Sequence, residues 1–568
     1  MIGKEGKMLR PAYGYTRFEF DEENDLKNYT VFLCDFVHGV PPWKPLYIIA
    51  GWSNYIWGLQ LAAETLHLPT TRGWDYRVID GHCYPTIIET TAEEAKQREP
   101  IFRQKIRPYL EDFDGVWEPF KSEIMNVYNH LKESRGLRVY EDIKKLENYE
   151  LAILFEDFIS IVNRREGEIH MLMMVPVYYI FGTFQQMWQE MFGTPSGVDP
   201  LFSKLMSGFE GSVFEMNREA WKLSRQAMEI GLDRLFQSTD NNEQIWEELQ
   251  KSQVAKKWLD EYSKFLNVYG WKCERMQDWA TPTWHERPSL GISTIRMAIR
   301  TGGTYSLDAT REGVTKEREK VAGEVLAKVP VDQREWFKVL MKGAQKAGYW
   351  SEDHTPYLDF YVCALGRWIT RELGRRFSQA GCINDPEDIY FLLPDDIRKA
   401  YITMGKVNLR PYVERRKKEW EENLKKEPKP FYGNIEKAHE MIMKDPSISV
   451  SVQAPIVRPE LKADLYGSAA APGVIEGVAR VVMTEKQLIE VQPGDILVAP
   501  GMSAPWTPVF EIISGVITDG GGATSHPVIV AREYGLPCVV GCIEATKKIK
   551  TGDRVRLDGD LGVVYILK

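Results

Sequence analysis

The pattern of apolar and polar positions divides the chain into regions of different texture. Over residues 1–115, short strand-like runs alternate with loops rich in proline and glycine, which predicts an irregular, aromatic-rich α/β lobe. Over residues 116–443, apolar residues recur at helical spacing, as at Ile143, Leu146 and Tyr149, which predicts a large and mostly helical domain.

The pattern changes again in the C-terminal quarter of the chain. Residues 444–462 contain small polar residues and prolines without a helical period, which predicts a linker. Residues 463–568 contain short apolar runs separated by glycine turns, which predicts a compact α/β domain with its own core. The expected fold class is therefore a multidomain α+β protein with an irregular N-terminal lobe, a helical domain and a C-terminal α/β domain.

Composition narrows the class of protein. The 568 residues include 72 Lys plus Arg and 81 Asp plus Glu, so the net charge is −9, which argues against broad contact with nucleic acid or anionic membranes. The most apolar stretch, residues 171–182, contains Pro176 and is too short for a spanning helix of about 20 residues, and the start lacks the apolar stretch of a secretory signal. We therefore expect a cytoplasmic protein.

Metal-binding and disulfide chemistry receive no support from the sequence patterns. The 7 cysteines are scattered and contain no CxxC pair, so neither a disulfide framework nor a zinc site is expected. No HExxH spacing occurs, and the remaining histidines, His170 among them, have no companion pattern that indicates a metal ligand. We therefore predict no metal site on this chain.

The sharpest chemical feature is a glycine-rich turn that joins an apolar strand-like run to a helical pattern. Glycines let successive backbone N–H groups point into one space, and a helix N-terminus adds partial positive charge, so the turn is expected to bind an anion. The same charge favours a neutral imidazole at the helix start, which is the nucleophilic form. The turn contains Gly520, Gly521, Gly522, Thr524, Ser525 and His526.

These residue types predict phosphoryl chemistry. We expect His526 to attack a phosphorus atom, and we expect backbone donors and the hydroxyls of Thr524 and Ser525 to hold the resulting phosphoryl group. Pro527 fits an early helical position, where its missing N–H costs nothing. The structural alternative is a glycine turn followed by a helix that contains a surface histidine.

The final domain resembles the mobile phosphohistidine domain of the phosphoenolpyruvate-utilising enzymes. The resemblance rests on four motifs in order, GSAAAPGVIEGVARVV, PGDILVAPGMSAPWTPVF, GVITDGGGATSHPVIVAREYGLPCVVG and GDRVRLDG. His526 matches the phosphorylated histidine of the family, and Pro527 stands where the family often has Ala. The resemblance implies a swivelling carrier that moves phosphoryl between a nucleotide site and a second active site.

The helical domain carries a second resemblance, through TPTWHERPSL and a later stretch that ends in PEDIYFL. These stretches resemble the substrate-side helical domain of rifampin phosphotransferase and of the large subunit of phenylphosphate synthase. The latter arrangement implies an acceptor domain for a phenol, a separate ATP-grasp subunit that binds ATP and Mg²⁺, and the products aryl phosphate, AMP and phosphate. Within the 568 residues we find no glycine-rich loop and Lys that would serve an ATP-grasp domain. Two alternatives are a non-enzymatic phosphocarrier and a phosphotransferase acting on an antibiotic or other bulky alcohol.

A phenol loses its proton near pKa 10, so we expect a base beside the acceptor oxygen. Glu352, Asp353 and His354 combine an imidazole with carboxylates at the expected start of a helix, and His354 is the predicted base. A capping cluster is the structural alternative.

Further candidates for the acceptor side lie in the preceding segment. His285 and Glu286 in the turn TPTWHERP are a second choice for substrate binding, with a structural turn as the alternative. Arg296 and Arg300, four residues apart on one helix face, could meet the incoming phosphoryl group, with a salt-bridged surface as the alternative.

Overall fold

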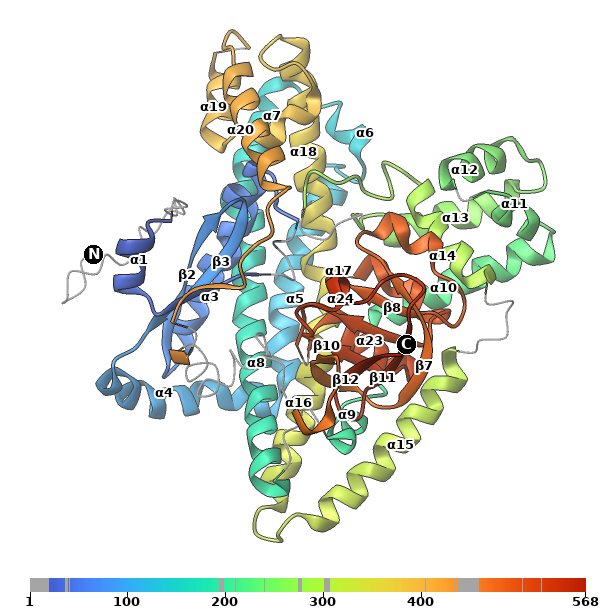
Figure 1. Cartoon of the computed structure of the whole chain (residues 1–568). Helices are drawn as coiled ribbons and strands as arrows, with labels where there is room; N and C mark the ends of the chain where they lie inside the picture. The colour runs from blue at the N-terminus through green and yellow to red at the C-terminus, as the bar shows by residue number, and fades with distance from the viewer. Residues whose placement is uncertain are drawn as a thin grey trace. The chain divides into compact units, whose positions relative to one another are not determined.

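The structure is a computed structural model (Figure 1), and its chain forms two compact units. Unit 1 comprises Met1–Val175, Gln277–Pro282 and Tyr357–Met441, and unit 2 comprises Pro176–Met276, Thr283–Pro356 and Ile442–Lys568. The described residues are 20–35, 39, 41–193, 199–209, 211–239, 241–273, 278–300, 307–403, 405–434, 436–437, 459–502, 504–522 and 524–567. Most of the predicted linker, residues 444–458, lies outside them.

Unit 1 is mostly helical and contains two small antiparallel ribbons, β1–β4 and β2–β3. Its first elements are α1 (Glu22–Asn28), β1 (Val31–Leu33), α2 (Pro45–Tyr47), η1 (Ile48–Trp52), α3 (Ser53–Leu66), β2 (Thr71–Ile79), β3 (His82–Glu89), α4 (Ala92–Glu111), α5 (Phe113–Asn129), η2 (His130–Ser134), α6 (Tyr140–Ile143), α7 (Asn148–Asp157) and η3 (Phe158–Val162). The later elements are α8 (Asn163–Phe192), α17 (Thr355–Leu358), α18 (Phe360–Gln379), η5 (Pro386–Phe391), α19 (Pro394–Ile402), α20 (Arg410–Asn423) and β4 (Phe431–Gly433). Helices α8 and α17 continue into unit 2.

The apolar spacing that begins at Ile143 spans two helices instead of one. α6 ends at Ile143, and α7 begins where the Glu150 carboxylate accepts a hydrogen bond from the Glu147 N–H at 2.8 Å. Ile143 is buried, whereas Tyr149 is 66% exposed. A helix start that satisfies its own N–H groups therefore overrides the apolar period at this point.

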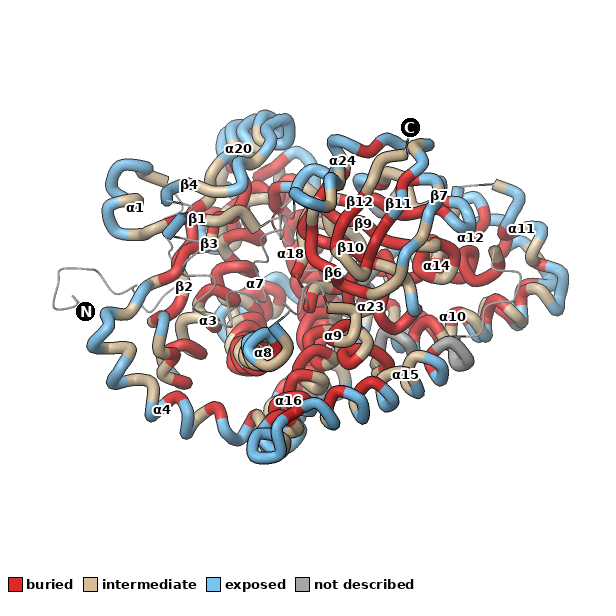
Figure 2. The backbone as a smooth tube through the Cα atoms, turned by 60° about the horizontal axis from the view of Figure 1, so that its bottom comes forward, coloured by how far each residue is buried: buried red, intermediate tan, exposed pale blue. Residues whose placement is uncertain are grey.

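The helical part of unit 2 packs around an aromatic core. Its helices are α9 (Pro200–Leu205), α10 (Ser212–Glu229), α11 (Asp233–Gln237), α12 (Asn242–Lys251), α13 (Lys256–Tyr269), α14 (Ser289–Arg300), α15 (Leu307–Lys328) and α16 (Arg334–Asp353). Trp258, Tyr262 and Ile295 are among the buried residues of one cluster formed by α10 to α14. The tube of α15 in Figure 2 alternates between buried and exposed segments, as expected for a helix with one packed face.

The C-terminal part of unit 2 is built on an eight-stranded sheet of order β5-β12-β11-β7-β8-β9-β10-β6. Strands β7, β8, β9 and β10 pair in parallel, and the remaining neighbours are antiparallel. The elements are η6 (Pro459–Leu461), β5 (Leu465–Tyr466), β6 (Ser468–Ala471), β7 (Val474–Val481), η7 (Glu485–Glu490), β8 (Ile496–Ala499), η8 (Ala504–Glu511), β9 (Gly515–Thr518), α23 (His526–Tyr534), β10 (Cys538–Val540), α24 (Ala545–Lys548), β11 (Arg554–Asp558) and β12 (Val563–Leu567).

Alternate residues of the central strands enter two different cores. In β9, Val516 belongs to the cluster that contains residues of α23 and η8, whereas Ile517 belongs to a second cluster with Ala545 and Ile549. Side chains of a strand alternate between the faces of a sheet, so both faces are covered and the strands are apolar throughout. The structure thus confirms a multidomain α+β fold with a C-terminal α/β sheet.

Among the described residues, every helix is too short or too polar to meet the length and hydropathy that membrane crossing requires.

Candidate functional site

The glycine-rich turn lies between β9 and α23, in the strand–turn–helix order that the sequence predicts. His526 is the first residue of α23, Ser525 is its N-cap in an extended conformation, and Pro527 occupies the first turn. Gly535 ends the helix in the left-handed region at φ 66°. The imidazole is therefore fixed at the positive end of a short helix that follows a buried strand.

The turn itself requires glycine and is closed by its own hydrogen bonds. Gly521 has φ +119°, and a Cβ added there would lie 2.9 Å from Ser525 Oγ. The Ser525 hydroxyl and backbone N–H both donate to the Gly522 carbonyl, at 2.8 and 3.0 Å, and the Gly520 N–H donates to the Pro500 carbonyl at 2.9 Å. The turn that positions His526 therefore contains a backbone conformation that residues with a side chain rarely adopt.

The His526 ring lies between two side chains from elsewhere in unit 2. Its Nδ1 is 2.7 Å from Glu352 Oε2 at the end of α16, and its Nε2 is 3.1 Å from Thr507 Oγ1 in η8. An ionised carboxylate only accepts hydrogen bonds, so the Nδ1–H of His526 donates to Glu352 in this pair. In a neutral imidazole with that tautomer, the Thr507 hydroxyl can donate to Nε2. The side chain of His526 is 6% exposed in this arrangement.

The segment before Glu352 also contacts the turn. Ser351 Oγ lies 3.4 Å from the Thr524 carbonyl oxygen and donates to the Gly348 carbonyl at 2.8 Å. Two of the sequence-predicted groups, the His526 turn and the Glu352 cluster, are thus brought together within unit 2. Thr507 had no sequence pattern that singled it out.

The prediction that Glu352, Asp353 and His354 open a helix is wrong, because they end α16 instead. The buried face of α16 extends to Trp350 and Ser351, so packing continues the helix up to this cluster. His354 is the C-cap, its Nδ1 lies 3.1 Å from the Trp350 carbonyl, and its ring stacks on Trp350 with a centroid distance of 4.8 Å.

Arg296 lies inside the helical part of unit 2. It is 5% exposed, and its guanidinium donates to the Phe236 carbonyl at 2.9 Å, to the Thr239 carbonyl at 2.8 Å and to Asn242 Oδ1 at 2.8 Å. These contacts hold α14 against the segment that joins α11 to α12.

The other predicted acceptor-side residues also have partners of their own. Arg300 donates to the Val491 carbonyl at 2.8 Å, which links α14 to the C-terminal part of unit 2. The His285 ring packs edge-on against Trp271 with a centroid distance of 5.0 Å. Glu286 Oε2 accepts from the Thr283 backbone N–H at 3.1 Å, as in a closed turn.

Helix α23 is fastened to the helical part of unit 2 at its far end as well. Glu533 accepts hydrogen bonds from the N–H groups of Gly208 and Phe209 at 2.9 and 3.0 Å, and Asn217 Nδ2 donates to the Tyr534 hydroxyl at 2.8 Å. Burial raises the pKa of Glu533 to about 7, although the hydrogen bond from Phe209 acts in the opposite direction. The helix that starts with His526 is thus held at both ends.

Comparison with known families covers both sides of the His526–Glu352 contact. Residues 491–562, which include His526, match the family described as PEP-utilising enzyme, mobile domain. Residues 170–352 match the family described as Rifampicin phosphotransferase fourth domain, and Glu352 is the last residue of that match.

Three curated relatives illustrate the similarity. The chain is 26% identical to the uncharacterized phosphotransferase YvkC of Bacillus subtilis over 406 residues, which are 70% of this chain and 47% of the relative. It is 28% identical to a rifampicin phosphotransferase of Bacillus cereus over 330 residues, 56% of this chain and 36% of the relative. It is 44% identical to a probable phosphoenolpyruvate synthase of Pyrococcus horikoshii over 106 residues, 19% of this chain and 13% of the relative.

The chain therefore spans about half the length of YvkC and a smaller share of the other two relatives. The match to the mobile domain contains the strand, glycine turn and histidine helix described above. The two matched parts of the chain are therefore similar to the mobile domain of the PEP-utilising enzymes and to the fourth domain of rifampicin phosphotransferase.

Proposed function

We propose that this chain is the acceptor side of a phosphotransferase, in which His526 receives phosphoryl and passes it to a small aromatic hydroxyl compound. A separate ATP-grasp subunit, holding ATP and Mg²⁺, would charge the histidine inside the cell, and the products would be aryl phosphate, AMP and phosphate. The observation that carries the proposal is the 2.7 Å contact between His526 Nδ1 and Glu352 Oε2. It links the residue that matches the family's phosphohistidine to the end of a domain that resembles a substrate domain.

The charging step uses the tautomer that this contact favours. In the tautomer with its proton on Nδ1, the imidazole presents the Nε2 lone pair to a donor phosphorus atom. The bond from Nε2 to the β-phosphorus forms while the P–O bond to AMP breaks, and AMP leaves with the electron pair. Water then attacks the γ-phosphorus of the pyrophosphorylated histidine, so that phosphate leaves and the β-phosphoryl group remains on Nε2. Thr507 lies in the same C-terminal domain as His526, so its hydroxyl must turn away from Nε2 to admit the donor phosphorus. The mobile domain must also leave Glu352 to reach a donor on the partner subunit.

The transfer step returns the lone pair to Nε2. The acceptor oxygen loses its proton to a base, forms the new O–P bond, and the Nε2–P bond breaks with its electrons remaining on the imidazole. The proposed proton acceptors are Glu352, which is next to the last residue of α16, and His354, which is the C-cap of that helix. Bases near the acceptor oxygen matter because a phenol ionises near pKa 10.

Phosphoryl trapping tests the proposal. The purified chain is mixed with ATP labelled at its β- and γ-phosphoryl groups, a candidate ATP-grasp partner, and phenol or catechol. Acid-labile label on the wild-type chain, none on His526→Ala, and a labelled aryl phosphate are expected. Labelling of the isolated chain by ATP alone would overturn the need for a partner. Label that never reaches a small molecule would favour a phosphocarrier.

A bulky alcohol is the second candidate acceptor. The match of residues 170–352 to the rifampicin phosphotransferase fourth domain favours it, as do relatives with that name. Offering rifampicin and phenol together to the labelled phosphohistidine chain separates the two candidates. The better acceptor takes the larger share of the label, which is measured as labelled rifampicin phosphate against labelled phenyl phosphate.

A further inference from the structure

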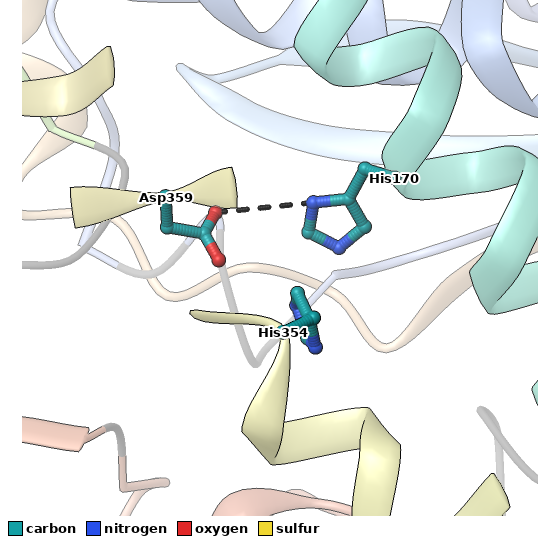
Figure 3. A group of neighbouring side chains, drawn as sticks. All are labelled: His170, His354 and Asp359. Atoms are coloured by element: carbon teal, nitrogen blue, oxygen red, sulfur yellow. Dashed lines mark ion pairs between the residues drawn. The ribbon is translucent and has the colours of Figure 1, made fainter. Parts of the chain in front are cut away.

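Unit 1 contains a buried polar cluster that the proposed function does not use. It consists of Tyr55 from α3, Glu166 and His170 from α8, and Asp359, the residue before α18. Their exposed fractions are 2%, 0%, 4% and 0% respectively. Figure 3 shows His170 with one ring nitrogen directed at the Asp359 carboxylate. Three segments of unit 1 therefore bring titratable groups to one buried point.

The distances from His170 to the two carboxylates are close to those between ligands of one small ion. His170 Nδ1 lies 3.2 Å from Glu166 Oε1 and 3.9 Å from Asp359 Oδ1. Zinc–nitrogen and zinc–oxygen bonds of about 2.1 Å place tetrahedral ligands about 3.4 Å apart, which falls between these two distances. The Tyr55 hydroxyl lies 3.4 Å from Glu166 Oε1 and 3.3 Å from Asp359 Oδ1, where it can steady both carboxylates.

Charge balance and hydrogen bonding point to the same ligand. One imidazole pairs with two carboxylates, so a second positive charge is required when both carboxylates are ionised. A divalent cation with two carboxylates and a neutral imidazole gives a net charge of zero. Among the described residues, none offers a hydrogen bond to Glu166 Oε2, although that atom is fully buried.

The backbone around the cluster allows the close approach that such a site requires. A Cβ on Gly58 in α3 would lie 2.3 Å from the Gly167 carbonyl in α8, so the two helices can meet this closely only with glycine. Asn163 in α8 donates to the Ala50 carbonyl at 3.0 Å and fixes the same crossing. Glu166 and His170 are four residues apart on one helix, which places both side chains on one face.

We propose that Glu166, His170 and Asp359 bind a divalent first-row cation of the Zn²⁺ type, with a fourth position left for water. Mixed imidazole and carboxylate ligands suit such ions better than Mg²⁺ or Ca²⁺, which prefer oxygen ligands alone. The ion ties α3, α8 and the start of α18 together, because it joins two of these segments directly and the third through Tyr55. The inference stands apart from the phosphoryl chemistry of His526.

Metal content and thermal unfolding of the full chain test the site. The chain is produced with added Zn²⁺ and passed through gel filtration, and about one Zn²⁺ per chain is expected by elemental mass spectrometry. Chelator should lower the Tm of the wild type, and Co²⁺ in place of Zn²⁺ should give the visible absorption of a four-coordinate ion. Glu166→Gln and His170→Asn should each lose most of the metal.

His130→Asn is the matched control, since it removes an exposed histidine of unit 1. It should retain both the metal and the Tm shift with chelator. A wild-type chain without metal and without a chelator effect on its Tm would overturn the proposal. Protons, and not a metal ion, would then neutralise the two carboxylates. Full metal content in both ligand variants, or preference for Mg²⁺ over Zn²⁺, would overturn it as well. The wild-type measurements decide the question even if a variant fails to fold.

Discussion

Two histidine–glutamate pairs in this chain have the same contact in different surroundings. In unit 1, His170 Nδ1 lies 3.2 Å from Glu166, four residues away on one helix. In unit 2, His526 Nδ1 lies 2.7 Å from Glu352, which is 174 residues away in sequence. A second carboxylate, Asp359, faces His170, whereas the Thr507 hydroxyl faces His526, which begins a helix.

The difference shows that the groups around an imidazole decide whether its site favours a bound cation or attack on an electrophile. Two carboxylates around His170 supply the oxygen ligands that suit the proposed cation. One carboxylate on Nδ1, a neutral hydroxyl beside Nε2 and the positive end of α23 favour attack on an electrophilic phosphorus atom and stabilise the negative charge of a phosphoryl group. The four predictions below test this contrast.

The largest effect is expected at His526. His526→Asn should abolish phosphoryl incorporation, because the amide has no nucleophilic ring nitrogen. Peptide mapping of the labelled wild type should place the label on the peptide with His526 and not on the one with His170. His130→Asn is the control and should label normally. Label on the His170 peptide would break the contrast between the two pairs.

Glu352 should have the next largest effect. Glu352→Gln removes the charge that orients the Nδ1–H and that can take the acceptor's proton, so the transfer rate should fall by about 10²-fold. Rapid-quench measurement of the discharge of pre-labelled protein gives this rate directly. Glu335→Gln, an exposed change in the first turn of the same helix, is the control. Equal rates for the two variants would show that the contact has no part in transfer.

Gly521 tests whether the turn before His526 must keep its shape. Gly521→Ala places a side chain at φ +119° and 2.9 Å from Ser525 Oγ, so we expect a loss of about 1–3 kcal/mol in the free energy of unfolding and slower charging of His526. Urea unfolding and the labelling rate measure the two effects. Gly501→Ala, where a Cβ meets open space, should change neither. An unchanged labelling rate in Gly521→Ala would count against the turn's role.

The smallest effect is expected at the far end of α23. Burial raises the pKa of Glu533 from its usual 4.5 to about 7, so the folded chain binds this proton more tightly than the unfolded chain does. Its contribution is therefore fully present below pH 4.5 and is lost as pH rises through 7. Glu533→Gln should flatten this decline in Tm. A wild-type Tm that rises over the same range, with the variant unchanged, would contradict the assignment.

Local features of the site could be predicted from the sequence. The strand, glycine turn and helix around His526 depend on neighbours within a few residues, and the structure has them in the predicted order. The helix end at Glu352 could not be predicted, because apolar packing up to Trp350 carries α16 through the cluster. The roles predicted for Arg296 and His285 remain untested predictions, although both side chains have protein partners.

The unit 1 cluster was missed although part of its signal is in the sequence. Glu166 and His170 form an E-x-x-x-H spacing that places both on one helix face, but the two residues alone do not distinguish a ligand pair from a surface ion pair. The second carboxylate, Asp359, is almost 200 residues away, so only the folded chain shows that it completes the group.

The sequence by itself determined the fold class and the identity and local setting of His526, because glycine conformations, helix starts and strand runs are properties of short segments. The tertiary structure decided which carboxylate each imidazole meets. That choice depends on how apolar faces far apart in the chain pack together and how closely glycines let helices approach, and no local pattern encodes either.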